Sequence, residues 1–193
     1  MKHMQCKCWW HQFFVKEISS EKLVKLFDEY LQATQLTIMK FSECYVPGGV
    51  YIATWILAES HFMIRVRPSD NKASCDLSCC NLKKFHKFLQ IVAPEMQSIA
   101  WHEWHDQSII KETNPDKINK SFDGYLKKAK LAVVAFEDCH FPGDGYTAIW
   151  MLEKGNFIVV HTFPEDGKTD VECSFNTADL DPFCGFLTFI NSQ

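Results

Sequence analysis

The fold is set by a stretch that occurs twice in the 193 residues, FSECYVPGGVY at residues 41–51 and FEDCHFPGDGY at residues 136–146. The same offset of 95 residues continues downstream through Trp55 and Trp150, and upstream through Phe27 and Phe122. Chance matches would not keep one offset over so long a distance. The sequence therefore predicts two copies of one structural unit. We expect residues 1–193 to form a single domain made of repeats 8–95 and 99–193.

Each copy has the same predicted order of elements. A strand at 8–16 or 99–110 comes first, and an amphipathic helix follows at 19–35 or 114–129, with Ser20 and Asn114 as the expected N-caps. A closing helix is expected at 82–92 and at 179–190. Between these helices, segments rich in β-branched and aromatic residues predict strands. Their ranges are 36–46, 50–58, 61–67 and 73–79 in the first copy and 131–137, 146–153, 156–163 and 168–175 in the second.

This order predicts an α+β protein, a tandem duplication of an αβ unit with antiparallel sheets and helices outside. Each sheet would have one apolar face to bury, and two such faces are most easily buried against each other. We therefore expect an αββα sandwich, a pseudo-dimer within one chain. The alternative is two αβ layers joined edge to edge into one longer sheet.

Composition narrows the classes of partner. A formal charge of −4 without a long basic run argues against nucleic acid. Neither a secretory signal nor an apolar run long enough for a membrane is evident. The nine cysteines are an odd number and lack paired C-x-x-C spacing, so we expect free thiols, a cytoplasmic location and no metal. The segment WHEWHD at 101–106 also lacks the His-Glu-x-x-His spacing of a zinc site.

Three short motifs carry the candidate chemistry: AESH at 58–61, CC at 79–80 and HTFPE at 161–165. A serine at a strand end is usually a turn residue, and a buried cysteine is usually part of the core. In this order and at these distances, however, the motifs resemble those of the S-adenosylmethionine decarboxylases. These pyruvoyl enzymes make the aminopropyl donor for polyamine synthesis. In their tandem-duplicated eukaryotic members, too, the serine and cysteine lie in the first half and the histidine in the second.

The resemblance implies that the chain cuts its own backbone between Glu59 and Ser60. Ser60 would then become a pyruvoyl group, the carbonyl cofactor that forms a Schiff base with the substrate amine and draws electrons away as CO2 leaves. His161 is expected to handle protons during this processing, with help from the hydroxyl of Thr147. Cys80 is expected to return a proton to the substrate carbon.

The resemblance also implies a substrate-binding set. Glu165 matches the family's ribose-binding carboxylate, an aromatic ring early in the second copy stacks on adenine, and an N-terminal aromatic-acidic motif favours the sulfonium cation. The residues of this set are Glu165, Leu57, Phe14, Glu17, Glu21, Phe136 and Phe141.

Two departures from the family pattern keep other functions open. The second copy has EKGN at 153–156 in place of AESH, so it has no serine to convert. Arg65 stands where bacterial members have the catalytic histidine, and a guanidinium in the cleft would oppose a sulfonium and favour a substrate with a carboxylate. The alternatives are an inactive paralogue that regulates an active decarboxylase, a relative acting on ornithine or arginine, and an unrelated αβ protein. Expected partners are a small-molecule substrate and a second subunit, either in a homodimer or in a heteromer with a paralogue.

Overall fold

The computed structural model describes residues 8–58, 60–97, 103–176 and 179–193. The chain divides into two compact units, the first unit with described residues 8–97 and the second unit with described residues 103–193. The described helices are too short or too polar to cross a membrane.

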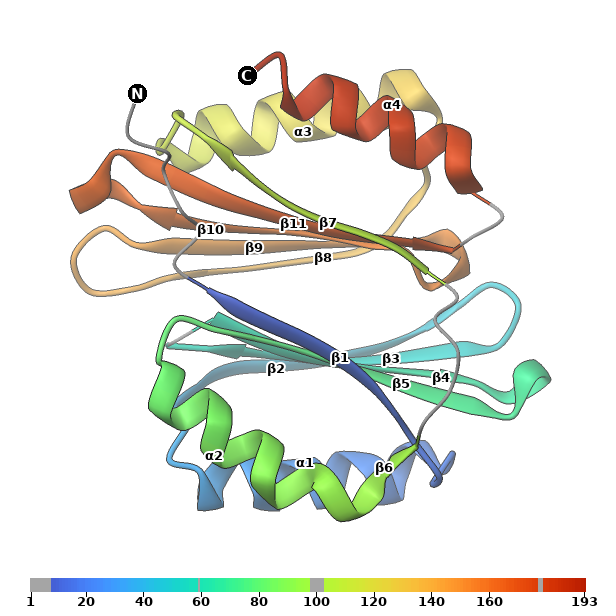
Figure 1. The fold of residues 1–193 in the computed structure, drawn as a ribbon. Coiled ribbons are helices and arrows are strands. Elements are labelled where there is room, and N and C mark those ends of the chain that lie inside the picture. Colours follow the sequence, from blue (N-terminus) through green and yellow to red (C-terminus); the bar gives the residue numbers. More distant parts are fainter. Residues whose placement is uncertain (1–7, 59, 98–102, 177–178) are drawn as a thin grey trace. The chain divides into compact units, whose positions relative to one another are not determined.

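In the first unit, one strand precedes a helix, four strands follow, and a second helix leads to a short edge strand (Figure 1). The bounds are β1 Trp9–Val15, α1 Ser20–Ala33, β2 Ile38–Val46, β3 Val50–Leu57, β4 Ser60–Arg67, β5 Lys72–Cys79, α2 Leu82–Val92 and β6 Met96–Gln97. The sheet order is β2-β3-β4-β5-β1-β6, and neighbouring strands are antiparallel.

The second unit repeats this plan among its described residues. Its bounds are β7 Glu103–Ile110, α3 Pro115–Ala129, β8 Val133–His140, β9 Tyr146–Leu152, β10 Phe157–Phe163, β11 Lys168–Asn176 and α4 Leu180–Ile190. The sheet order β7-β11-β10-β9-β8 is that of β1-β5-β4-β3-β2, with each strand replaced by its counterpart. The predicted α+β class and the tandem duplication are therefore confirmed.

The turn inside the repeated stretch explains its glycines. Gly48 and Gly49, between β2 and β3, have φ of 96° and 81°. In the second copy Gly143 and Asp144 have φ of 87° and 64°. Such backbone angles favour glycine, and aspartate accepts them more readily than most residues. The Pro-Gly segment therefore ends one strand and starts the next in both units.

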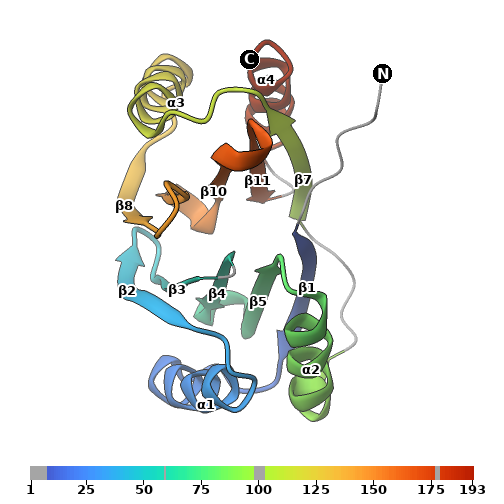
Figure 2. The same cartoon turned by 90° about the vertical axis from the view of Figure 1, so that its left-hand side faces the viewer.

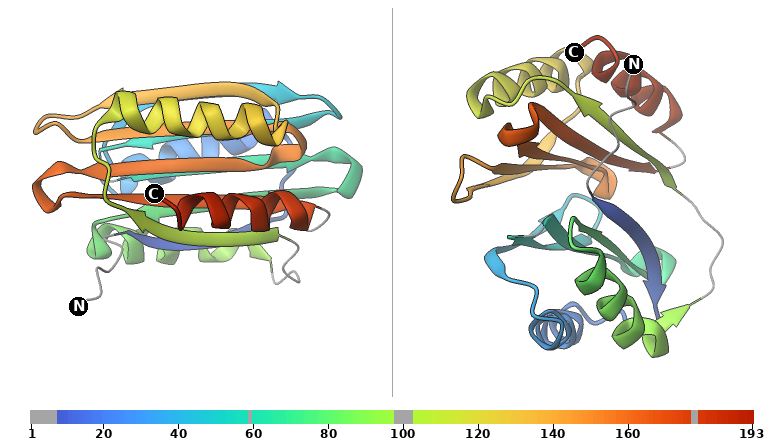
Figure 3. Two further views of the ribbon diagram at one scale, coloured as in Figure 1. Left: turned by 90° about the horizontal axis from the view of Figure 1, so that it is seen from above. Right: turned by 60° about the vertical axis from the view of Figure 1, so that its left-hand side comes forward.

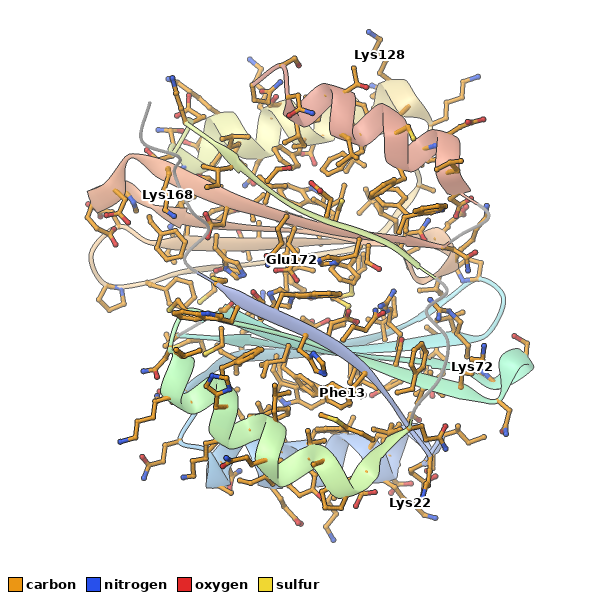
Figure 4. All side chains as sticks on the ribbon, viewed as in Figure 1. Phe13, Lys22, Lys72, Lys128, Lys168 and Glu172 are labelled. Atoms are coloured by element: carbon orange, nitrogen blue, oxygen red, sulfur yellow. The ribbon has the colours of Figure 1, made fainter. Side chains whose placement is uncertain are left out.

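Each sheet is covered on one face by the two helices of its own unit (Figures 2 and 3). Apolar residues spaced three or four apart give each helix one buried stripe. The stripes are Leu23, Phe27 and Leu31 on α1, Phe85, Phe88 and Val92 on α2, Ile118, Phe122 and Leu126 on α3, and Phe183, Phe186 and Ile190 on α4. Phe13 of β1 packs against the stripes of α1 and α2 in the core of the first unit (Figure 4).

The repeat extends to single hydrogen bonds. The indole Nε1 of Trp55 donates to Asp28 Oδ1 at 2.6 Å, and that of Trp150 donates to Asp123 Oδ1 at 2.9 Å. Each bond joins the middle of a sheet to the helix that covers it, so both units fix their first helix in the same way.

One predicted helix cap differs from the structure. The N-cap of α1 is Ser19 rather than Ser20, and its side chain makes no capping hydrogen bond. Asn114 does cap α3, because its side chain accepts a hydrogen bond from the backbone N–H of Lys117. The strand expected from residue 99 is described from Glu103 onward, since residues 99–102 lie outside the described part.

Candidate functional site

Ser60 occupies the first position of β4, at one end of the first sheet. Its backbone pairs with Leu57 of β3 and Cys79 of β5, and 4% of its surface is exposed. Leu57 and Cys79 belong to the core under α1 and α2. Alternation along β4 places Ser60 on the same face as Phe62. The φ of Ser60 is 156°, a value that residues with a side chain rarely adopt. Ser60 is therefore a buried residue in a strained backbone conformation.

The two adjacent cysteines follow the neighbouring strand end. Cys79 is the last residue of β5 and is fully buried. Its Sγ accepts a hydrogen bond from the backbone N–H of Asn81 at 3.4 Å, and Asn81 caps α2. Cys80 lies between these two residues and is half-buried. The register thus brings Ser60 beside Cys79, with Cys80 one residue further on, while Glu59 lies outside the described residues.

Thr147 and His161 face each other in the second unit. They are register partners on β9 and β10, and Thr147 Oγ1 lies 2.7 Å from His161 Nδ1. Both side chains lie on the sheet face opposite α3 and α4, because alternation directs Ile158 and Val160 toward the helices. When the hydroxyl donates to Nδ1, the neutral ring keeps its proton on Nε2. The imidazole then presents an N–H donor.

Burial lowers the pKa of His161 to about 3. In an unfolded chain the pKa of a histidine is about 6.5. Between these values the unfolded state binds a proton that the folded state does not. The free energy of unfolding should therefore fall as the pH decreases from about 6.5 toward 3. Above pH 6.5 the ring is neutral in both states, and His161 causes no further change in stability.

Denaturant unfolding between pH 7 and pH 4 tests this expectation. The curve of stability against pH should be flatter for His161→Gln than for the parent protein, by at most about 1.4 kcal/mol per pH unit. His86→Gln is the matched control, because His86 is exposed on α2. Parallel curves for the parent and His161→Gln would show that the pKa of the ring is the same in the folded and unfolded states, as for an accessible histidine.

Arg65 holds the position in the first unit that His161 holds in the second. Its Nη2 donates to Asp76 Oδ2 at 2.7 Å, and both side chains are fully buried. The other carboxylate oxygen of Asp76 accepts a hydrogen bond from Gln12 Nε2, also at 2.7 Å. The guanidinium charge is therefore compensated within the first sheet. The expectation that Arg65 selects a substrate carboxylate loses its basis.

Glu17 has a structural role that its counterpart repeats. Its carboxylate accepts a hydrogen bond from the backbone N–H of Ser19 at 2.8 Å, which lowers its pKa, and it pairs with Lys22 at 3.3 Å. In the second unit Glu112 accepts from the backbone N–H of Asn114 at 2.9 Å and also has a lysine partner at 3.3 Å. Contacts present in both units belong to the fold. The role of Glu17 in substrate binding stays a prediction.

Phe14 lies far along the sheet from Ser60. Ser60 pairs with Cys79, whereas Phe14 pairs with Ser74, five residues earlier on β5. At about 3.4 Å per residue, this separates the two positions by roughly 17 Å. Glu21 is exposed in the first turn of α1, where it lines a hollow of about 270 Å³. The two side chains also lie on opposite faces of the sheet, because Phe14 alternates with Phe13 and Val15 of the helix-covered core, so one ligand does not reach both.

The remaining candidates have distinct surroundings. Leu57 is fully buried in the core of the first unit. The ring of Phe136 lies 5.1 Å from that of Trp150, a contact between β8 and β9. Phe141 closes the following turn, where its N–H donates to the carbonyl of Gly145. Glu165 is exposed in the 3-10 turn Pro164–Asp166, which follows β10.

Sequence reasoning missed the buried pair of Gln12 and Asp76. A signal was present, because Asp76 is the single acid in the apolar strand KASCDLSC at 72–79. An acid in such a strand needs a buried partner, and Gln12 and Arg65 are the partners here.

No protein-family model matches the sequence, and no curated protein matches it. Among solved structures, the chain is similar to the crystal structure of the adenosylmethionine decarboxylase from Aquifex aeolicus VF5. The identity is 21% and the TM-score is 0.36, and the match covers 47% of this chain and 81% of that chain.

Proposed function

We propose that the chain is a self-processing, pyruvoyl-dependent decarboxylase of S-adenosylmethionine. The observation that carries this proposal is the 2.7 Å contact between Thr147 and His161. The motif resemblance had selected these two residues for one task, although they lie on different strands.

In the proposed processing step, the hydroxyl of Ser60 attacks the carbonyl carbon of residue 59. The new C–O bond replaces the peptide C–N bond and gives an ester. Elimination then breaks the bond between the ester oxygen and Cβ of residue 60, which leaves a carboxylate on residue 59 and a dehydroalanine at position 60. The imine tautomer of that dehydroalanine takes up water and releases ammonia, and the pyruvoyl group remains. The φ of 156° at Ser60 supports this step, because strain in the uncut chain is released when the backbone opens. A neutral imidazole with its proton on Nε2 is suited to donate a hydrogen bond to the oxyanion that forms. Thr147 would hold the ring in that orientation.

A pyruvoyl group formed from Ser60 would supply an electron-withdrawing carbonyl for the loss of CO2. Cys80, which follows the strand end beside Ser60, would donate the proton that replaces the carboxylate. The eight described cysteines form no disulfide with one another, which suits this role and the predicted reducing cytoplasm.

Mass measurement on freshly purified protein tests the proposal. The 193-residue chain should give fragments of 59 and 134 residues, and hydroxylamine should add to the larger one at its N-terminal carbonyl. Carboxyl-labelled S-adenosylmethionine should release labelled CO2, and ornithine and arginine should not. A soluble chain that stays whole and does not react with hydroxylamine would remove the proposed cofactor.

One observation favours the second candidate, an inactive paralogue that regulates an active decarboxylase. Ser60 shares the helix-covered face of its sheet with Leu57 and Cys79. His161 lies on the face of the second sheet that α3 and α4 do not cover. A serine held in a packed core cannot take part in turnover. This candidate predicts an uncut chain that elutes from gel filtration in a heteromer with the active enzyme.

A further inference from the structure

A groove lies between α3 and α4 of the second unit. Its volume is about 450 Å³, within the usual range for small-molecule sites. The two helices run side by side over the sheet (Figure 3). The lining includes Tyr125, Lys128 and Ala129 from α3 and Gly185 and Phe189 from α4.

In the first unit, a lysine side chain bridges the two helices at the position that corresponds to this groove. Aligning the buried stripes of α2 and α4 makes Lys87 the counterpart of Gly185. Lys87 Nζ reaches across to α1 and donates to the carbonyl of Ala33 at 2.7 Å. By the offset of 95, Ala33 is the counterpart of Lys128. The second unit therefore has a glycine where the first has the bridging lysine, and a lysine where the first has alanine.

The tyrosine in the groove also differs from its counterpart. In the first unit the hydroxyl of Tyr30 donates to Glu95 at 3.5 Å. In the part of the chain that the structure describes, the hydroxyl of Tyr125 has no hydrogen-bond partner. A Cβ atom added at Gly185 would lie 3.1 Å from this hydroxyl. Gly185 therefore leaves space beside the hydroxyl of Tyr125, which can form a hydrogen bond with a ligand.

The chemistry of the lining defines what fits. The ring of Phe189 stacks on that of Tyr125, with centroids 4.5 Å apart, and forms an apolar wall. Lys128 lies three residues after Tyr125, on the same side of α3, and extends to the outer surface (Figure 4). It forms no ion pair with any residue in the described ranges. An apolar wall beside one ammonium and one hydroxyl suits an aromatic body that carries a single negative charge.

We propose that this groove binds a small aromatic carboxylate. The ring of the ligand would lie against Phe189 and Ala129, and its carboxylate would accept hydrogen bonds from Lys128 Nζ and the hydroxyl of Tyr125. The site is separate from the residues of the proposed decarboxylase. Its test is therefore independent of whether the chain is processed.

Calorimetric titration of the whole protein with 3-phenylpropionate tests the site. We expect saturable binding with a Kd of about 0.1–1 mM, as for a ligand of this size. The uncharged 3-phenylpropanamide should bind at least tenfold more weakly. Lys128→Gln and Tyr125→Phe should each weaken binding of the carboxylate by about five- to tenfold. Gly185→Lys, which restores the lysine of the first unit, should abolish it.

Lys120→Gln is the matched control, because Lys120 is exposed on α3 but does not line the groove, and it should leave the Kd unchanged. Absence of saturation at about 10 mM probe would overturn the proposal. Equal binding of acid and amide, or equal effects of Lys128→Gln and Lys120→Gln, would overturn it as well. The two side-chain truncations keep the test decisive if Gly185→Lys fails to fold.

Discussion

Ser60→Ala should leave the chain intact at 22.4 kDa in preparations where the parent protein is cut into two fragments. Alanine has no hydroxyl to attack the preceding carbonyl, so neither the ester nor the pyruvoyl group can form. We expect complete loss of cleavage and of decarboxylation, because this one side chain is both the nucleophile and the source of the cofactor. Intact-mass spectrometry reads the first effect, and release of labelled CO2 reads the second.

Ser78→Ala is the matched control for this experiment. Ser78 is a buried serine on β5 that pairs with His61 of β4. The Ser78→Ala protein should be cut like the parent protein. Cleavage that persists in Ser60→Ala would assign the cut to another residue or to a contaminating protease. An uncut parent chain that forms a complex with an active decarboxylase would instead support the regulatory candidate.

Asp76→Ala should cost about 3–5 kcal/mol of unfolding free energy. The substitution leaves the guanidinium of Arg65 buried without its carboxylate, and removing one partner of a buried ion pair has a cost of this size. The side-chain amide of Gln12 loses its acceptor at the same time. Denaturant unfolding followed by circular dichroism measures the change, and a protein too unstable to purify meets the same expectation.

The double variant Arg65→Met/Asp76→Leu distinguishes the effect of losing the ion pair from the effect of leaving one buried charge uncompensated. Replacing both partners by apolar side chains should recover most of the stability, because no uncompensated charge remains. Lys22→Ala, which breaks the exposed pair with Glu17, should have a much smaller effect. A loss for the double variant as large as that for Asp76→Ala would mean that packing, rather than charge compensation, sets the cost.

Most of the fold could be predicted from the sequence because its local signals agree. The Pro-Gly turns, the strand composition and the helix stripes recur at one offset, so each copy supports the interpretation of the other. The helix predicted at 82–92 is observed as Leu82–Val92, and the ends of the predicted strands lie within three residues of the observed ends, apart from the start of β7, where residues 99–102 lie outside the described part. The short strand β6 was not predicted. The N-cap of α1 was predicted one residue too late, because the chain has two adjacent serines there and only the backbone decides which one is the cap.

The candidate site was predictable only where a hairpin sets the register. A short turn joins β9 to β10, so the partner of His161 follows from counting residues back to Thr147. The pairing of β1 with β5 joins residues more than 50 positions apart, and no turn defines its register. The contact between Gln12 and Asp76 could not be deduced for that reason.

The matching indole–carboxylate bonds of Trp55 and Trp150 point to the history of the chain. The simplest origin of both bonds is one ancestral polypeptide of about half this length that already had the bond, which both copies kept while much of the remaining sequence changed. Before the gene was duplicated, every copy of that ancestor had the same residue at any given position. Fusion removed this constraint, and two equivalent positions could then evolve separately into Arg65 and His161.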